Sequence, residues 1–65
     1  MGNIGSIIDG LEIIAAHVGR DDFISAEDDE IFAGDRPGPK TPEGEMLLEL
    51  GWRWEEDLET WAMFV

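Results

Sequence analysis

Apolar side chains recur along this chain with two different spacings, and the change between them is what most constrains the fold. Over residues 6–18, SIIDGLEIIAAHV, and at Ile4 just upstream, they follow the i, i+3, i+4, i+7 stripe of an amphipathic helix. Ser6 is predicted to cap this helix and Gly19 to end it. Gly10 weakens the middle of the helix by about 1 kcal/mol relative to Ala, or else lets another group pack closely.

The helical spacing then gives way to two short segments with the composition of β-strands. DFISAE, residues 22–27, and EIFAG, residues 30–34, are rich in Phe and Ile and flank Asp28-Asp29. They predict a β-hairpin. Two-residue hairpin turns favour Asn-Gly or Asp-Gly, so a looser or longer turn is expected here.

A second pair of strands is predicted at the end of the chain, in WRWEEDLETWAMFV. Trp52 and Trp54 alternate with Arg53 on one arm, and residues 61–65 alternate on the other, with acidic residues 55–57 at the turn. Tryptophans spaced by two on a hairpin favour packing in the core over an exposed aromatic contact surface.

Between the two hairpins, the sequence predicts a loop and a short helix. Residues 34–40, GDRPGPK, form the loop, and residues 41–43 supply an N-cap threonine, an N1 proline and an acidic first turn. The helix is expected over residues 43–50 and to stop at Gly51. Its inward side chains are expected to be Met46, Leu47 and Leu50.

The order helix, hairpin, helix, hairpin predicts one α+β domain over residues 1–65, with antiparallel strands packed on two helices (αββαββ). A chain of 65 residues is near the lower size at which an apolar core alone suffices, and it has no cysteine for a disulfide. However, 43% of the residues are apolar, including three Trp and three Phe. That is too much for a solvated acidic tail. A compact, monomeric domain is expected.

Negative charge is concentrated where the chain turns. The chain has 16 acidic and 4 basic residues, a net charge of −12, and eight of the acids fall within residues 27–30 and 55–59. Gly, Asn or Ser would make better turns, and neighbouring like charges repel by roughly 1 kcal/mol per pair in water. The placement therefore indicates selection for a negative field, although acidic surfaces also serve solubility.

Such a field suits a basic partner. Duplex DNA carries one negative charge per ~1.7 Å of its axis, and a small acidic domain can approximate this spacing. The chain would then occupy a groove whose Lys and Arg residues normally hold phosphates. The carboxylates expected to contact that groove are Asp21, Asp22, Glu27, Asp28, Asp29, Glu30, Asp35, Glu55, Glu56, Asp57 and Glu59.

Other functions find little support in the residues. His17, the sole histidine, suits the C-terminal end of a helix, and one histidine with scattered acids does not supply a zinc site. The run EDDE lacks the alternating acids and central glycine of a calcium loop, though calcium binding stays open. No nucleophile motif or phosphate loop occurs, so we expect neither catalysis nor a cofactor. No signal peptide, membrane span or direct binding to nucleic acid is expected.

Two segments carry a resemblance to a known group: SAEDDEIFAG at 25–34 and LGWRWEEDLETWAMFV at 50–65, together about 26 of the 65 residues. With the small, cysteine-free, very acidic format, they resemble anti-CRISPR proteins of phages and mobile elements, particularly double-stranded-DNA mimics that act on type I Cascade. The resemblance implies an inhibitor in the bacterial cytoplasm that blocks the site where Cascade engages PAM-containing duplex. It carries over a mechanism and no individual site residue.

Two alternatives remain besides calcium binding. The chain could be a mimic directed at another DNA-binding enzyme, such as a restriction or repair enzyme, because these share the same compositional logic. It could also be an acidic interaction module that binds a protein through its Trp-rich C-terminal hairpin, since tryptophan is enriched in binding hot spots.

Overall fold

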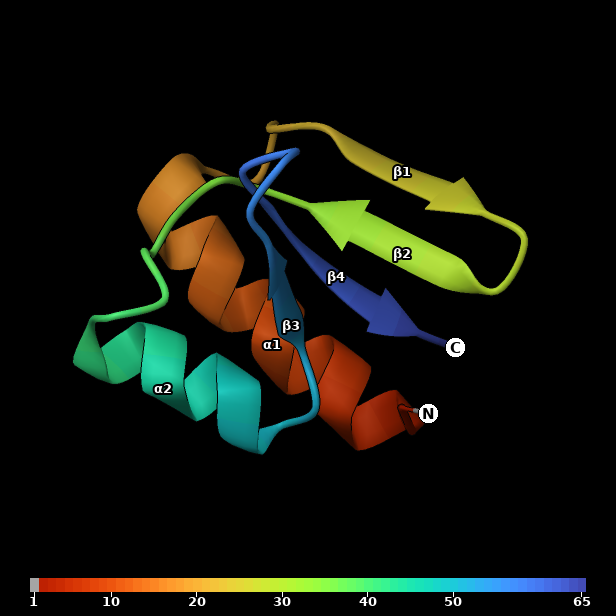
Figure 1. The fold of residues 1–65 in the computed structure, drawn as a ribbon, viewed down its shortest axis with the longest axis horizontal. Helices are drawn as coiled ribbons and strands as arrows, with labels where there is room; N and C mark the ends of the chain where they lie inside the picture. The colour runs from red at the N-terminus through yellow and green to blue at the C-terminus, as the bar shows by residue number, and fades with distance from the viewer. Residues whose placement is uncertain (1) are drawn as a thin grey trace.

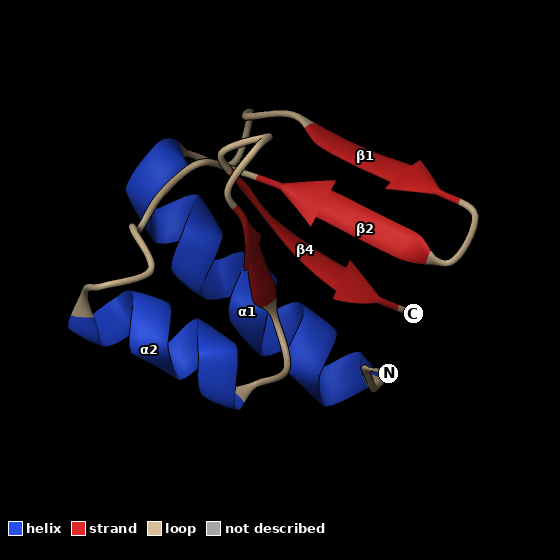
Figure 2. Cartoon of the chain, in the orientation of Figure 1, coloured by secondary structure: helices blue, strands red, loops and turns tan. Residues whose placement is uncertain are grey.

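Two helices and a four-stranded antiparallel sheet form the fold of the computed structural model, which describes residues 2–65 (Figures 1 and 2). The α+β class and the single domain with antiparallel strands are as expected. The elements, in chain order, are α1 (Ile4–Val18), β1 (Ile24–Glu27), β2 (Glu30–Ala33), α2 (Pro42–Glu49), β3 (Arg53–Glu55) and β4 (Thr60–Phe64).

The sheet joins the two hairpins through their second strands, in the order β1-β2-β4-β3. Phe32 of β2 pairs with Ala62 of β4, and Trp54 of β3 pairs with Trp61 of β4. Both helices lie on one side of the sheet (Figure 2). Because β2 and β4 run antiparallel, the β1–β2 turn and the β3–β4 loop lie at opposite ends of the sheet.

Helix α1 begins earlier than the sequence predicts, and Ser6 is not its cap. The N-cap is Asn3, whose side chain accepts a hydrogen bond from the Ser6 backbone N–H at 2.8 Å. Asparagine is among the best N-cap residues, so the helix extends back to Ile4. The predicted end is confirmed: Gly19 follows the last helical residue with a φ of 96°.

At Gly10, helix α1 packs closely against Trp52, the residue before β3. Gly10 is buried, and a Cβ built on it would overlap the indole of Trp52, with the Cδ1 atom 2.7 Å away. The Trp52 indole N–H also donates to the Ser6 carbonyl of α1 at 3.1 Å. Trp52 and Trp61 are 2% and 0% exposed, which confirms that these tryptophans pack in the core.

The start and end of α2 are confirmed. Thr41 caps it by accepting from the Gly44 N–H at 3.0 Å. At the other end, the N–H groups of Gly51 and Trp52 donate to the carbonyls of Leu48 and Leu47 at 3.1 and 3.0 Å. This is a Schellman motif, which needs the left-handed conformation that Gly51 adopts, φ 99°. It delivers the chain from α2 directly into the core at Trp52.

One of the side chains predicted to face inward from α2 does not. Leu47 is fully buried and Leu50 is partly buried, but Met46 is 51% exposed. The inward positions are spaced by three, at Gly44, Leu47 and Leu50. Met46 lies about 100° around the helix from Leu47 and therefore faces away.

The turn of the first hairpin is tighter than expected. Glu27 pairs with Glu30, so only Asp28 and Asp29 lie between the strands, and the prediction of a looser or longer turn is wrong. Asp28 adopts a positive φ of 51°. Aspartate tolerates this conformation better than most residues, so the tight turn forms without glycine.

A candidate acidic binding surface

At one end of the sheet, three adjacent carboxylates project from the β1–β2 turn. Glu27, Asp28 and Asp29 are all exposed, and we refer to them as the turn cluster. The C-terminal residue lies beside it, since the Val65 N–H donates to the Asp29 carbonyl at 2.7 Å. The backbone of this turn is therefore held from both hairpins while its carboxylates face solvent.

At the opposite end, three segments bring six acids together. The connection from α1 to β1, the loop after β2 and the β3–β4 loop each contribute, and Asp22, Asp35 and Glu59 line one small pocket of about 240 Å³. We refer to the six exposed residues as the loop cluster: Asp21, Asp22, Asp35, Glu56, Asp57 and Glu59. Residues from three segments, 13 to 38 positions apart in the sequence, thus share one end of the molecule.

The remaining two predicted contact residues are occupied within the fold. Glu30 of β2 and Glu55 of β3 both accept hydrogen bonds from the Arg53 guanidinium, Glu55 at 2.6 Å. The side chains of all three are 25 to 34% exposed. The sequence places Glu55 in the turn of this hairpin, and that prediction is wrong: Glu55 is the last residue of β3. These two carboxylates are less available to a partner than those of the two clusters.

Arg53 bridges the outer face of the sheet, the side opposite the helices. Its guanidinium carbon lies 4.3 Å from the centre of the Phe64 ring, within range of a cation–π contact. It pairs across the ladder with Ala62, which is fully buried. Arg53 therefore covers the centre of this face while it neutralises part of the charge of two strands.

The carboxylates do not form a metal site in the part of the chain that the structure describes, because no three His, Asp or Glu side chains of residues 2–65 are grouped so as to hold an ion. His17 lies exposed in the last turn of α1, at the helix end predicted for it. Among residues 2–65, neither helix has the length and hydrophobicity that a transmembrane span requires.

Glu59 closes the β3–β4 loop in a conformation that suits glycine or asparagine. Its φ is 51°, and apart from Asp28 it is the only non-glycine among the described residues with a positive φ. The left-handed region costs an ordinary residue roughly 1–2 kcal/mol. The charge at this position is therefore kept against the local conformational preference, as the sequence indicates for both turns.

We expect Glu59→Asn to stabilise the fold by about 1 kcal/mol, because asparagine tolerates the left-handed conformation. Urea unfolding followed by tryptophan fluorescence measures this. Glu56→Asn is the matched control, since it makes the same change of charge and side chain at a residue whose φ is not positive. Equal stabilisation by the two substitutions would show that relief of charge repulsion, and not conformation, is responsible.

Comparison with protein-family models, with curated proteins and with solved structures gives no match for this chain.

Proposed function

We propose that this protein is an inhibitor that occupies a basic DNA-binding site by presenting carboxylates in place of phosphates. The observation that carries the proposal is the exposure of the turn and loop clusters. Apart from Asp35, which lies 3.7 Å from Arg36, their carboxylates make no ion pair with any of residues 2–65. They remain available for the Lys and Arg side chains of a partner.

The density of charge supports this proposal. The longest dimension of the molecule is 27 Å, and a DNA duplex of that length carries about 16 phosphate charges at one per ~1.7 Å. The chain carries a net charge of −12 within the same length. A basic groove that binds a short stretch of duplex would therefore meet a comparable total charge on this protein.

The placement of that charge at two ends also fits a groove. The strands between the clusters have three to five residues, which separates their ends by roughly 10–17 Å at ~3.4 Å per residue. The intervening outer face carries Arg53, whose charge is already paired. A partner with two basic patches would contact both clusters at once.

The resemblance directs the proposal to a type I Cascade complex in the bacterial cytoplasm, at the site that engages PAM-containing duplex. A restriction or repair enzyme with a basic duplex-binding groove is the same kind of target. The alternative of binding through the Trp-rich hairpin has less support, because Trp52 and Trp61 are buried and Trp54 is half-buried, which leaves Phe64, 45% exposed, as the accessible aromatic side chain of this hairpin.

Three variants with the same net charge test the proposal. One neutralises the turn cluster (Glu27→Gln, Asp28→Asn, Asp29→Asn). The second neutralises three acids of the loop cluster (Glu56→Gln, Asp57→Asn, Glu59→Gln). The control neutralises exposed acids on α2 (Glu43→Gln, Glu45→Gln, Glu49→Gln). Each is mixed with purified Cascade and its target duplex, and DNA binding is followed across a salt series.

We expect the unaltered protein to block DNA binding at low salt and to lose this effect as salt rises. Either cluster variant should weaken inhibition at least about tenfold, which is about 1.4 kcal/mol, while the α2 control stays within about threefold. Equal effects of all three would mean that only total charge matters. Undisturbed DNA binding at low salt, with no association of the two proteins, would remove Cascade as the target.

A further inference from the structure

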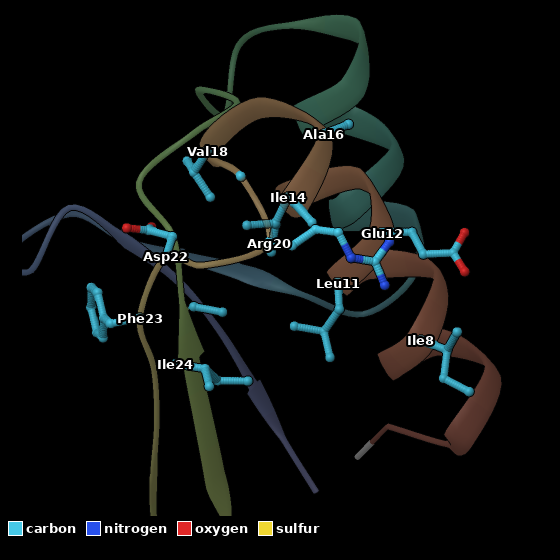
Figure 3. Close-up of a pocket in the computed structure, with 14 residues that line it drawn as sticks. Ile8, Leu11, Glu12, Ile14, Ala16, Val18, Arg20, Asp22, Phe23 and Ile24 are labelled. Atoms are coloured by element: carbon cyan, nitrogen blue, oxygen red, sulfur yellow. The ribbon is translucent and has the colours of Figure 1, made fainter.

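An open apolar groove of about 850 Å³ lies between α1 and the chain segment that leads into β1. Figure 3 shows Leu11 pointing from α1 toward Ile24 on the opposite wall. Along α1, the groove is lined by Ile8, Leu11, Ala15 and Val18, spaced by three, four and three residues. This row runs for about 15 Å, close to three helical turns.

Large apolar side chains are left uncovered at this groove. Ile8 is 49% exposed and Ile24 is 56% exposed, and Ile4, one turn before Ile8, is 76% exposed. All four residues of β1 are exposed, and β1 is an edge strand with no neighbour on its outer side in residues 2–65. A further helix placed here would cover both the ridge of α1 and the exposed Ile24 of β1.

The charges around the groove select the chemistry of an occupant. Glu12 and Asp22 line it with a single basic residue, Arg20, and Asp22 also belongs to the loop cluster. The groove therefore opens directly onto the acidic end of the molecule. A second copy of this chain would bring another net charge of −12 against it, which disfavours self-association.

We infer that the groove binds an amphipathic helix of the partner protein, with Leu- or Ile-like side chains on one face and Lys or Arg at its flanks. A helix fits better than an extended strand, because the exposed ridge on α1 matches the i, i+3, i+4, i+7 side chains of a partner helix. A strand added to β1 would leave that ridge uncovered. This inference rests on the proposed function, in that the same basic partner supplies the helix.

The test uses a synthetic 18-residue peptide, Leu on one helical face and Lys and Arg elsewhere, and a second peptide of the same composition with its leucines scattered. Binding to the full chain is measured at low and high salt, and methyl NMR of the Ile and Leu residues locates the contact. The groove variant is Ile8→Ala/Ile24→Thr. The control is Met46→Ala/Leu48→Ala, which removes side chains of similar exposure, 51% and 46%, from α2.

We expect the striped peptide to shift the methyl signals of Ile8, Leu11 and Ile24 and to bind at least about tenfold more weakly to the groove variant than to the control. At high salt, the striped peptide should still bind the chain, whereas the scattered peptide should not. Equal binding of both peptides, removed by salt and unaffected by the groove variant, would overturn the inference and leave charge mimicry standing. Conversely, the peptide binding the groove while the full chain fails to block DNA binding in the Cascade assay is a distinct result. That result would support the groove and reject the proposed function.

Self-association gives a separate outcome. If sedimentation shows a dimer that the groove variant dissociates, the occupant is a second copy and the inference is wrong. We expect a monomer at all concentrations in moderate salt, where repulsion between copies is only partly screened.

Discussion

Gly10→Ala is expected to destabilise the protein by about 3 kcal/mol, even though it replaces a mid-helix glycine with the best helix former. The change in helix propensity favours alanine by about 1 kcal/mol. The new methyl group would, however, overlap the buried Trp52 indole, which its hydrogen bond to Ser6 and the Schellman motif before it both hold in place. Overpacking of a core and loss of a buried hydrogen bond outweigh the gain.

A second glycine of the same helix gives the matched control. At Gly5, an added Cβ would meet only the Asn3 side-chain oxygen, at 3.4 Å. Gly5→Ala should therefore stabilise by about 0.5 kcal/mol. Urea unfolding measures both. In the background of Trp52→Phe, which removes part of the indole, Gly10→Ala should cost much less. If Gly10→Ala is as stable as the unaltered chain, α1 and Trp52 do not pack as described.

The elements of the fold could be predicted because local signals coincide with them. The helical stripe, the Thr41-Pro42 start, the stops at Gly19 and Gly51 and the period of two around the tryptophans all act within a few residues. What could not be predicted is decided over longer distances. The pairing of β2 with β4 joins two hairpins that are far apart in the sequence, and neither strand carries a local signal that specifies the other as its partner.

The errors in detail have local physical causes. Asn3 and Ser6 are both residue types that cap helices well. Because residues 4–6 are themselves helical, Asn3 is the N-cap. Met46 is apolar but lies off the inward side of α2, a direction that a single short helix leaves ambiguous. Asp28 accepts a left-handed conformation that the sequence alone assigns more readily to glycine or asparagine.

The acidic surface was visible in the sequence, but its division was not. Nearness in sequence groups Glu30 with Asp29 and Glu55 with Glu56. In the structure, Glu30 and Glu55 are strand residues that pair with Arg53, and they are therefore separated from the exposed acids beside them. Asp22, Asp35 and Glu59 meet only through the sheet register. One feature of the sequence indicated the groove. The apolar stripe of residues 4–18 is wider than the face of the helix that the core buries, and Ile4 and Ile8 are therefore exposed.

That role of Arg53 leads to the second large effect. Arg53→Met should destabilise by about 2–3 kcal/mol, because methionine can still cover Ala62 but leaves two half-buried carboxylates without a cation between them. Arg36→Met is the matched control: it also brings the net charge to −13, but its pair with Asp35 is 65 and 67% exposed, so the loss should stay below about 0.5 kcal/mol.

The effect of the two unpaired carboxylates can be separated from the effect of removing the other contacts of the Arg53 side chain. Adding Glu30→Gln and Glu55→Gln to Arg53→Met removes both stranded charges, and we expect this triple variant to recover at least half of the stability in urea unfolding. Salt should stabilise Arg53→Met more than the triple variant, since it screens repulsion that only the former retains. If Arg53→Met and Arg36→Met lose equal stability, Arg53 does not organise the outer face. If the triple variant recovers nothing, the contact of Arg53 with Phe64, and not its carboxylate pairs, holds that face together.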